Sequence, residues 1–196
     1  MKLIESIIPI INLQTDRQPN KFIFPKQKNV NKIEQIEKKL NIFFPTSYKE
    51  FMKLFDGGFI NLLSDLEDIG IEDAKWNSNY LFSLDEVKQE YINLKAKSWK
   101  FTPEGNVNYP FVPFCRSQLN ELLVFVNPLL SKESYIFEAV HDVPYKDWNM
   151  VFFEFSDFLS AYIDEEGDID FFGENSDTTL SDYLNNFPYT RELYFK

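Results

Sequence analysis

The first clear pattern along the chain is a set of apolar residues at helical spacing. Ile33, Ile36 and Leu40 lie three and four residues apart, which places them on one face of an α-helix. Asn31 and Glu34 have the spacing of a capping box. A helix is therefore predicted to begin near Asn31.

A second helix is predicted to begin at Pro45, whose fixed φ angle suits the first helical turn. Ser47 and Glu50 repeat the capping-box spacing. The apolar residues of this helix again share one face: Tyr48, Phe51, Met52 and Phe55. Gly57 and Gly58 are predicted to end it, because glycine adopts the left-handed conformation without steric cost.

The segments on either side of this helix pair have weaker patterns. In residues 1–30, the short apolar runs at 7–11 and 21–24 are interpreted as edge strands. Residues 59–63 are predicted to form a strand, and residues 64–80 an irregular acidic loop that carries Trp76.

A third helix should follow, since Ser83 and Glu86 form a capping box ahead of Val87, Tyr91 and Leu94.

Four short apolar runs, separated by turn-like stretches, occupy the second half of the chain. They are residues 111–115, 122–126, 135–139 and 149–153. Runs of this length and spacing are typical of adjacent antiparallel strands. A last helix, capped by Ser156, is predicted from its apolar face of Phe158, Leu159, Tyr162 and Ile163. The predicted class is α+β: an N-terminal helix pair followed by an antiparallel or mixed sheet with flanking helices.

Composition agrees with one folded domain. The chain has 196 residues, of which 44% are hydrophobic and 17% aromatic, enough to build a large core and to leave aromatic side chains for a partner surface. The apolar stretches fall short of the roughly 18–20 residues that span a bilayer, and the N-terminus lacks the pattern of a signal peptide. One cysteine, Cys115, excludes an intramolecular disulfide. We therefore expect a cytoplasmic protein with no membrane partner.

The net charge of −11 is confined to one stretch. Residues 147–190 contain eleven acidic residues and no lysine or arginine, while the rest of the chain has twenty acids and twenty bases. Such a charge disfavours nucleic acid as a partner. Two interpretations stay open: a solubilising acidic face, or a docking surface for a basic protein.

Candidate catalytic and metal-binding residues are few. Cys115 and His141 are the only possible Cys–His pair, and a thiol in an apolar strand is usually buried and inert. A zinc site needs about four ligands, and the acidic run from Asp164 to Glu174 has Ile169 where a calcium loop requires glycine. No glycine-rich phosphate loop is present. The sequence predicts no metal, no cofactor and no enzymatic activity.

The helix pair resembles a known family. The stretch IEQIEKKLNIFFPTSYKEFMKLFDGG is similar to the opening signature of the SUKH superfamily, which has an apolar helix, a proline, a Tyr-x-x-Phe helix and two glycines. The matching residues are Pro45, Tyr48, Phe51, Gly57 and Gly58. Later segments also resemble the family: 81–84, 111–114, His141-Asp142, Trp148 and 155–159.

This resemblance covers residues 31–163 and implies a SUKH-like domain, with an N-terminal extension at 1–30 and an acidic C-terminal extension at 164–196. One departure lies at 117–121, where family members commonly have a Gly/Asp-rich hairpin and this chain has no glycine. Trp148 is expected in the core.

The resemblance implies a non-catalytic domain that binds proteins. Bacterial members resemble immunity proteins against secreted toxins, and fungal members act in cell-wall regulation. We therefore expect an immunity protein that binds the basic surface of a cognate toxin, with a scaffold for a cellular enzyme as the alternative. The expected contact residues are acidic, with one aromatic anchor: Asp164, Glu165, Glu166, Asp168, Asp170, Glu174 and Trp76.

Overall fold

The computed structural model describes residues 4–63, 70–97, 111–126, 135–169 and 178–186. Within these residues it confirms the α+β class. The helices are α1 (Ile4–Arg17), α2 (Lys32–Leu40), α3 (Thr46–Leu54), α5 (Ile71–Trp76), α6 (Leu84–Lys97), α7 (Phe155–Asp164) and α8 (Leu180–Asn186), with a 3-10 helix, η2 (Tyr145–Asp147).

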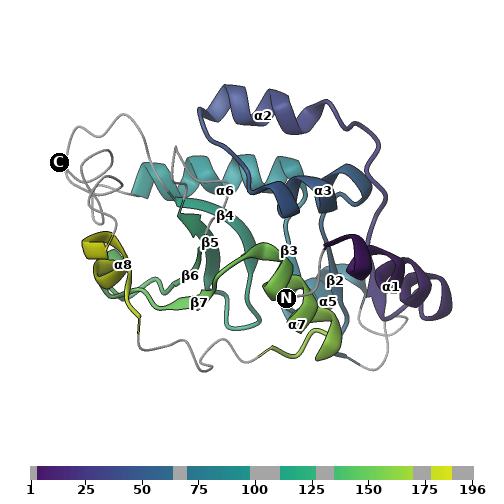
Figure 1. Ribbon diagram of the computed structural model, residues 1–196. Coiled ribbons are helices and arrows are strands. Elements are labelled where there is room, and N and C mark those ends of the chain that lie inside the picture. The colour runs from purple at the N-terminus through teal and green to yellow at the C-terminus, as the bar shows by residue number, and fades with distance from the viewer. Residues whose placement is uncertain (1–3, 64–69, 98–110, 127–134, 170–177, 187–196) are drawn as a thin grey trace.

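The strands form one seven-stranded sheet whose strand order follows the chain (Figure 1). The strands are β1 (Phe22–Ile23), β2 (Gly58–Ile60), β3 (Tyr80–Leu81), β4 (Phe111–Arg116), β5 (Leu122–Val126), β6 (Ile136–Ala139) and β7 (Met150–Phe152). Every neighbouring pair is antiparallel. The four predicted apolar runs are thus confirmed as consecutive antiparallel strands, β4 to β7.

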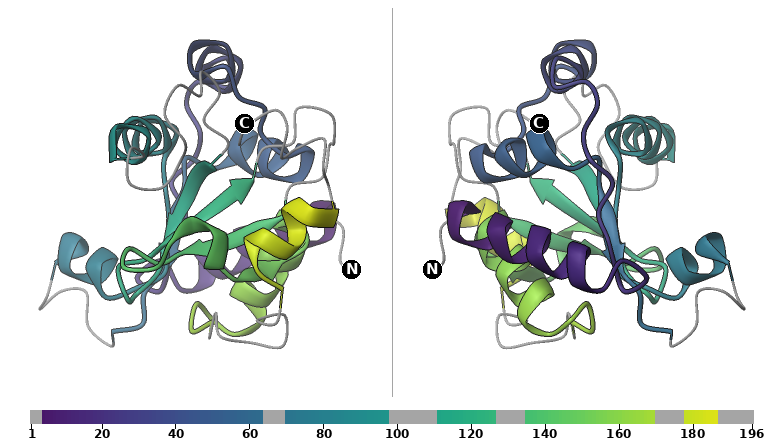
Figure 2. Two further views of the ribbon diagram at one scale, coloured as in Figure 1. Left: turned by 90° about the vertical axis from the view of Figure 1, so that its left-hand side faces the viewer. Right: turned by 90° about the vertical axis from the view of Figure 1, so that its right-hand side faces the viewer.

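Helices cover both faces of this sheet. Figure 2 shows α1, α3 and α7 on one side of the sheet and α6 on the other. The α1, α3 and α7 helices contact one another, α6 packs on β4, and α2 contacts both α3 and α6. Almost every residue of β4 and β5 is buried, because helices cover both faces of these strands.

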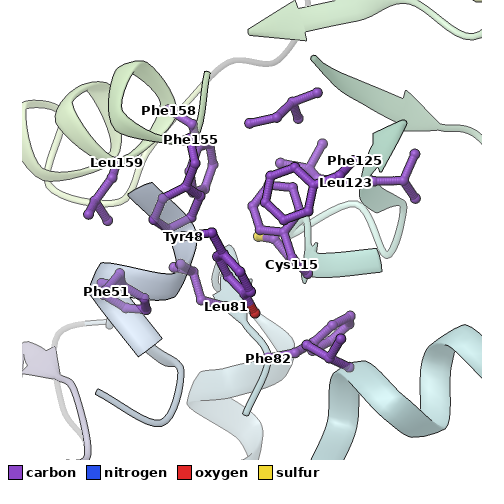
Figure 3. Packing of buried hydrophobic residues seen from close by; sticks show 14 of the residues in the cluster. Tyr48, Phe51, Leu81, Phe82, Cys115, Leu123, Phe125, Phe155, Phe158 and Leu159 are labelled. Carbon is purple, nitrogen blue, oxygen red and sulfur yellow. The ribbon is translucent and has the colours of Figure 1, made fainter. Parts of the chain in front are cut away.

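The core is dominated by aromatic rings from α3, α7 and the central strands (Figure 3). Phe114 and Phe125 stack with their ring centroids 4.2 Å apart. Phe155 and Tyr48 meet edge to face at 5.0 Å. The aromatic side chains that seemed surplus to a core therefore mostly fill it, although Trp76 is an exposed exception.

Tyr48 carries a polar atom into this apolar cluster. Its side chain is fully buried, and its hydroxyl has no hydrogen-bond partner among the described residues. Burial raises the pKa of Tyr48, with a smaller contribution from the charge of Asp56. An unpaired buried hydroxyl costs about 1–3 kcal/mol. We expect Tyr48→Phe to fold normally and to be at least as stable as the parent chain in urea denaturation. A loss above about 1 kcal/mol would show that the hydroxyl has a partner.

The capping predictions had mixed outcomes. The Ser83–Glu86 capping box is confirmed: the Ser83 N–H donates to Glu86 Oε2 at 2.8 Å, and the Glu86 N–H lies 3.4 Å from Ser83 Oγ. Asn31 lies at the N-cap of α2, as predicted, but its φ and ψ angles are helical and its side chain makes no cap hydrogen bond. The cap predicted at Ser47 was wrong, because Pro45 is at the N-cap of α3.

The predicted Ser156 cap was also wrong, because the N-cap of α7 is Glu154. Ser156 lies inside the helix, and its hydroxyl donates to Glu154.

The apolar run at 7–11 is a helix rather than the predicted edge strand. Ile4, Ile7 and Ile11 have the spacing of a single helical face, and all three are buried. Packing of α1 against α3 and α7 outweighs the interior Pro9, which removes only one helical hydrogen bond. The run at 21–24 does contain an edge strand, β1, as predicted.

Two segments have more regular structure than the sequence indicated. The predicted loop at 64–80 contains the helix α5 and the strand β3, although residues 64–69 lie outside the described part. Beyond residue 164, Ile169 and two residues of the α8 segment, Leu180 and Tyr183, join the core. The domain boundaries at 30 and 164 stay predictions.

Candidate partner-binding surface

An acidic turn follows directly after α7 and comprises residues 164–168. The Gly167 N–H donates to the carbonyl of Tyr162 at 2.8 Å, and the Glu165 N–H donates to Ala161 at 2.8 Å. Glu166 has a φ of 50°, so the chain reverses here as in a Schellman motif. Gly167 and Ile169 are buried, and the four acidic residues of the turn are exposed: Asp164, Glu165, Glu166 and Asp168.

The turn is held to the sheet by two buried side chains. The Tyr162 hydroxyl accepts a hydrogen bond from the Ile60 N–H at 2.9 Å and donates to the Asn79 carbonyl at 2.5 Å. Burial raises the pKa of Tyr162, which keeps this hydroxyl protonated. The Asn79 amide group donates to the Gly167 carbonyl at 2.8 Å. Because these contacts are buried, the backbone of the turn has a defined position.

Trp76 is the last residue of α5, and 56% of its surface is exposed. The Arg116 guanidinium lies over its ring, 3.9 Å from the centroid. Arg116 also donates to the Lys75 carbonyl at 3.4 Å. A cation stacked on an indole is a favourable contact that limits the rotation of the ring.

The structure therefore brings part of the expected contact set together. Four acids lie on one turn, and Glu166 forms an ion pair with Lys21. Trp76 is three residues before Asn79, whose side-chain amide donates a hydrogen bond to the Gly167 carbonyl in the same turn. Asp170 and Glu174 lie outside the described residues. The role of Asn79 was missed, since a lone asparagine in a loop-like segment gives no local signal.

The residues that resembled the family signature lie in the interior. Tyr48, Phe51 and Trp148 are buried, and so is Pro45 at the N-cap of α3. The indole N–H of Trp148 donates to the Val143 carbonyl at 3.1 Å. These side chains are available for packing rather than for partner contact.

The prediction that Gly57 and Gly58 end the helix was wrong. Helix α3 ends at Leu54, and Phe55 is already extended because it bridges to Lys26. The two glycines instead allow neighbouring backbone segments to approach closely. Beside them, the Asp56 carboxylate accepts the Leu84 N–H at 3.1 Å, which caps α6. The sequence pattern did not predict this cap, because Asp56 and Leu84 are 28 residues apart.

The turn at 117–121 uses asparagine where a glycine was missing. Asn120 has a φ of 63°, a conformation that asparagine tolerates better than most residues. The Ser117 N–H donates to the Glu121 carbonyl at 2.8 Å and closes the turn.

Cys115 and His141 have different environments. Burial raises the pKa of the Cys115 thiol, which is fully buried and therefore not a ready nucleophile. The His141 ring is 71% exposed, and its Nδ1 lies 2.6 Å from Glu121 Oε1. The ring also lies 3.1 Å from Asp142 through Nε2. The Cys115 thiol contacts the Arg116 carbonyl, whereas the His141 ring contacts Glu121 and Asp142.

Protonation of His141 should make the stability of the folded chain depend on pH. The hydrogen bond to Glu121, together with the charges of Glu121 and Asp142, raises the pKa of His141 above the ordinary histidine value of 6.5. Because the pKa of His141 is higher in the folded chain than in the unfolded chain, protonation of His141 stabilises the fold. This stabilisation is fully present below about pH 6.5, the ordinary pKa of histidine. This stabilisation is lost as the pH rises through the raised pKa. An NMR titration of the sole histidine should show a midpoint above 6.5, and Glu121→Gln should lower that midpoint. An unchanged midpoint in Glu121→Gln would contradict this assignment.

Among the residues that the structure describes, no group of three or more His, Cys, Asp or Glu side chains is placed to hold a metal ion. No described helix combines the length and the apolar character needed to cross a membrane.

Comparison with known protein families gives a match over most of the chain. The model of the SMI1 / KNR4 family (SUKH-1) matches residues 29–188. This range includes the helix pair, the whole of β2 to β7 and the acidic turn. No curated protein matches the chain.

Proposed function

The chain belongs to the SMI1 / KNR4 family (SUKH-1), and on that basis we propose that it is a non-catalytic protein-binding domain. More specifically, it is an immunity protein that neutralises a cognate bacterial toxin by direct contact in the cytoplasm. The family supports a protein partner. The immunity role goes beyond family membership and rests on the charge distribution described next.

The acidic turn is the observation that carries this proposal. Four exposed acids lie within five residues on a backbone held by buried hydrogen bonds. They belong to the stretch that holds the entire net charge of −11. A fixed cluster of one charge attracts a partner of the opposite charge and orients it before contact. A toxin that acts on nucleic acid has a basic active-site surface, which this turn would occupy in place of phosphate.

The charge-based proposal is tested by neutralising the turn. A triple variant, Asp164→Asn, Glu165→Gln and Asp168→Asn, should bind the candidate toxin with an association rate lower by about tenfold or more at low salt. The candidate toxin is the protein encoded by the neighbouring gene, identified by its co-purification with the chain. Its binding should also depend less on salt.

The matched control removes three other exposed acids, on α1 and α2: Glu5→Gln, Asp16→Asn and Glu34→Gln. It should change the rate much less. An unchanged rate in the first variant would refute the electrostatic contact.

The biological role needs a separate measurement. Coexpression of the chain with the toxin should restore growth of cells that the toxin alone kills. If the chain binds no toxin and gives no rescue, the alternative gains support, in which it is a scaffold that regulates a cellular enzyme.

A further inference from the structure

Three large apolar side chains are exposed on α5 and on the turn that follows β4. Ile71 and Trp76 lie on α5, and Leu119 lies at the tip of the 117–121 turn with 61% of its surface exposed. Arg116, the last residue of β4, is stacked on Trp76 and is three residues from Leu119. We call these four residues the Trp76 surface.

The Trp76 ring is already positioned before any partner arrives. Arg116 packs on it at 3.9 Å and donates to the Lys75 carbonyl, so the stack joins β4 to α5. An exposed aromatic side chain that is held in place loses less conformational entropy on binding. Tryptophan and arginine are also the residues most enriched among those that dominate interface energies.

The charges around the Trp76 surface favour a basic partner. The nearby cations are engaged within the chain, since Lys75 lies over the Tyr80 ring and pairs with Glu86, and Arg116 is covered by Trp76. The acids are exposed: Asp73 on α5, together with the four acids of the acidic turn. The result is an apolar centre with an acidic rim, which is the usual arrangement of a protein interface.

Asn79 joins the parts of this surface into one unit. Its side chain is fully buried, and its amide group donates to Gly167 in the acidic turn at 2.8 Å. Its side-chain oxygen accepts the Gln118 N–H from the 117–121 turn at 2.9 Å. Because Asn79 follows α5 by three residues, one buried side chain sets the relative positions of all three segments.

We propose that the Trp76 surface and the acidic turn form a single docking site for a basic protein, with Trp76 at its centre. This inference rests on the proposed function and extends it. Trp76 and Leu119 provide most of the binding affinity, and the acidic turn raises the association rate. Asn79 is the positioning residue of the site and does not itself contact the partner.

The test measures binding of the same purified candidate toxin by surface plasmon resonance. Trp76→Ala should weaken the affinity at least about 30-fold, mainly through faster dissociation, with the salt dependence unchanged. Leu119→Ala should weaken it in the same direction. The matched control is Phe153→Ala, which removes an aromatic ring of similar exposure beyond β7, at the opposite edge of the sheet from β1, and should leave the affinity unchanged.

The outcomes separate this inference from the proposed function. If Trp76→Ala and Leu119→Ala bind as tightly as the parent chain while the acidic-turn variant binds slowly, the Trp76 surface is not the docking site and the proposed function stands. If the parent chain does not bind the candidate toxin, both are overturned. Circular dichroism and urea denaturation confirm that each variant is folded.

Discussion

Replacing Gly57 with alanine is expected to lower the free energy of unfolding by about 2–5 kcal/mol. Gly57 has a φ of +76°, where a residue with a side chain costs about 1–2 kcal/mol. An added Cβ would also lie 2.5 Å from the Leu81 carbonyl oxygen and 2.7 Å from the Ser83 nitrogen. These are backbone atoms that cannot rotate away, and overpacking costs about a further 1–3 kcal/mol. Urea denaturation followed by circular dichroism measures the loss.

Gly70 provides a matched control for Gly57. It has nearly the same φ, +74°, but an added Cβ would meet nothing within 4 Å. Gly70 has a ψ of 158°, so Gly70→Ala should cost only the backbone strain of this glycine-specific region, about 1–3 kcal/mol. Equal losses in the two variants would show that strain alone explains Gly57 and that the close approach to the Leu81–Ser83 backbone adds nothing.

Replacing Phe155 with alanine should lower the free energy of unfolding by about 3–5 kcal/mol, the usual cost of removing a buried aromatic ring. Phe155 is fully buried, and its centroid lies 5.0 Å from that of Tyr48 and 5.5 Å from that of Phe51. It therefore joins α7 to α3 across the core (Figure 3). The cavity left by alanine would lie between α3 and α7, two of the three helices on that face of the sheet (Figure 2).

Phe153 is the control for Phe155, two residues away in the chain. It is 49% exposed and meets the Tyr135 ring at 6.0 Å. Phe153→Ala should cost less than about 1 kcal/mol, as is usual for exposed positions. A large loss in this variant would mean that the segment before α7 is more tightly packed than its exposure indicates.

These two predictions concern stability, and the binding predictions concern a different set of residues. Gly57 and Phe155 lie in regions that resembled the family and are packed inside the molecule. Trp76, Leu119 and the acidic turn are exposed. Variants of the second set should thus change binding while leaving the unfolding transition almost unchanged, so the two properties can be measured independently.

Local patterns predicted the elements whose stability depends on nearby residues. The face of α2, the capping box at Ser83 and Glu86, and the apolar runs of β4 and β5 all appear within windows of a few residues. The helix α1 was missed although Ile4, Ile7 and Ile11 have helical spacing, because Pro9 and the short apolar run favoured a strand. Its packing against α3 and α7 decides the outcome.

By itself, the sequence determined the class of fold, the helix pair with its family signature, and the confinement of the net negative charge to residues 147–190. Only the tertiary structure decided that Asp56 caps α6, that Arg116 lies on Trp76, and that Asn79 joins the acidic turn to the rest of the surface. The physical reason is separation along the chain. Asn79 and Gly167 are 88 positions apart, and a hydrogen bond of that range forms only when the sheet and helices between them have packed.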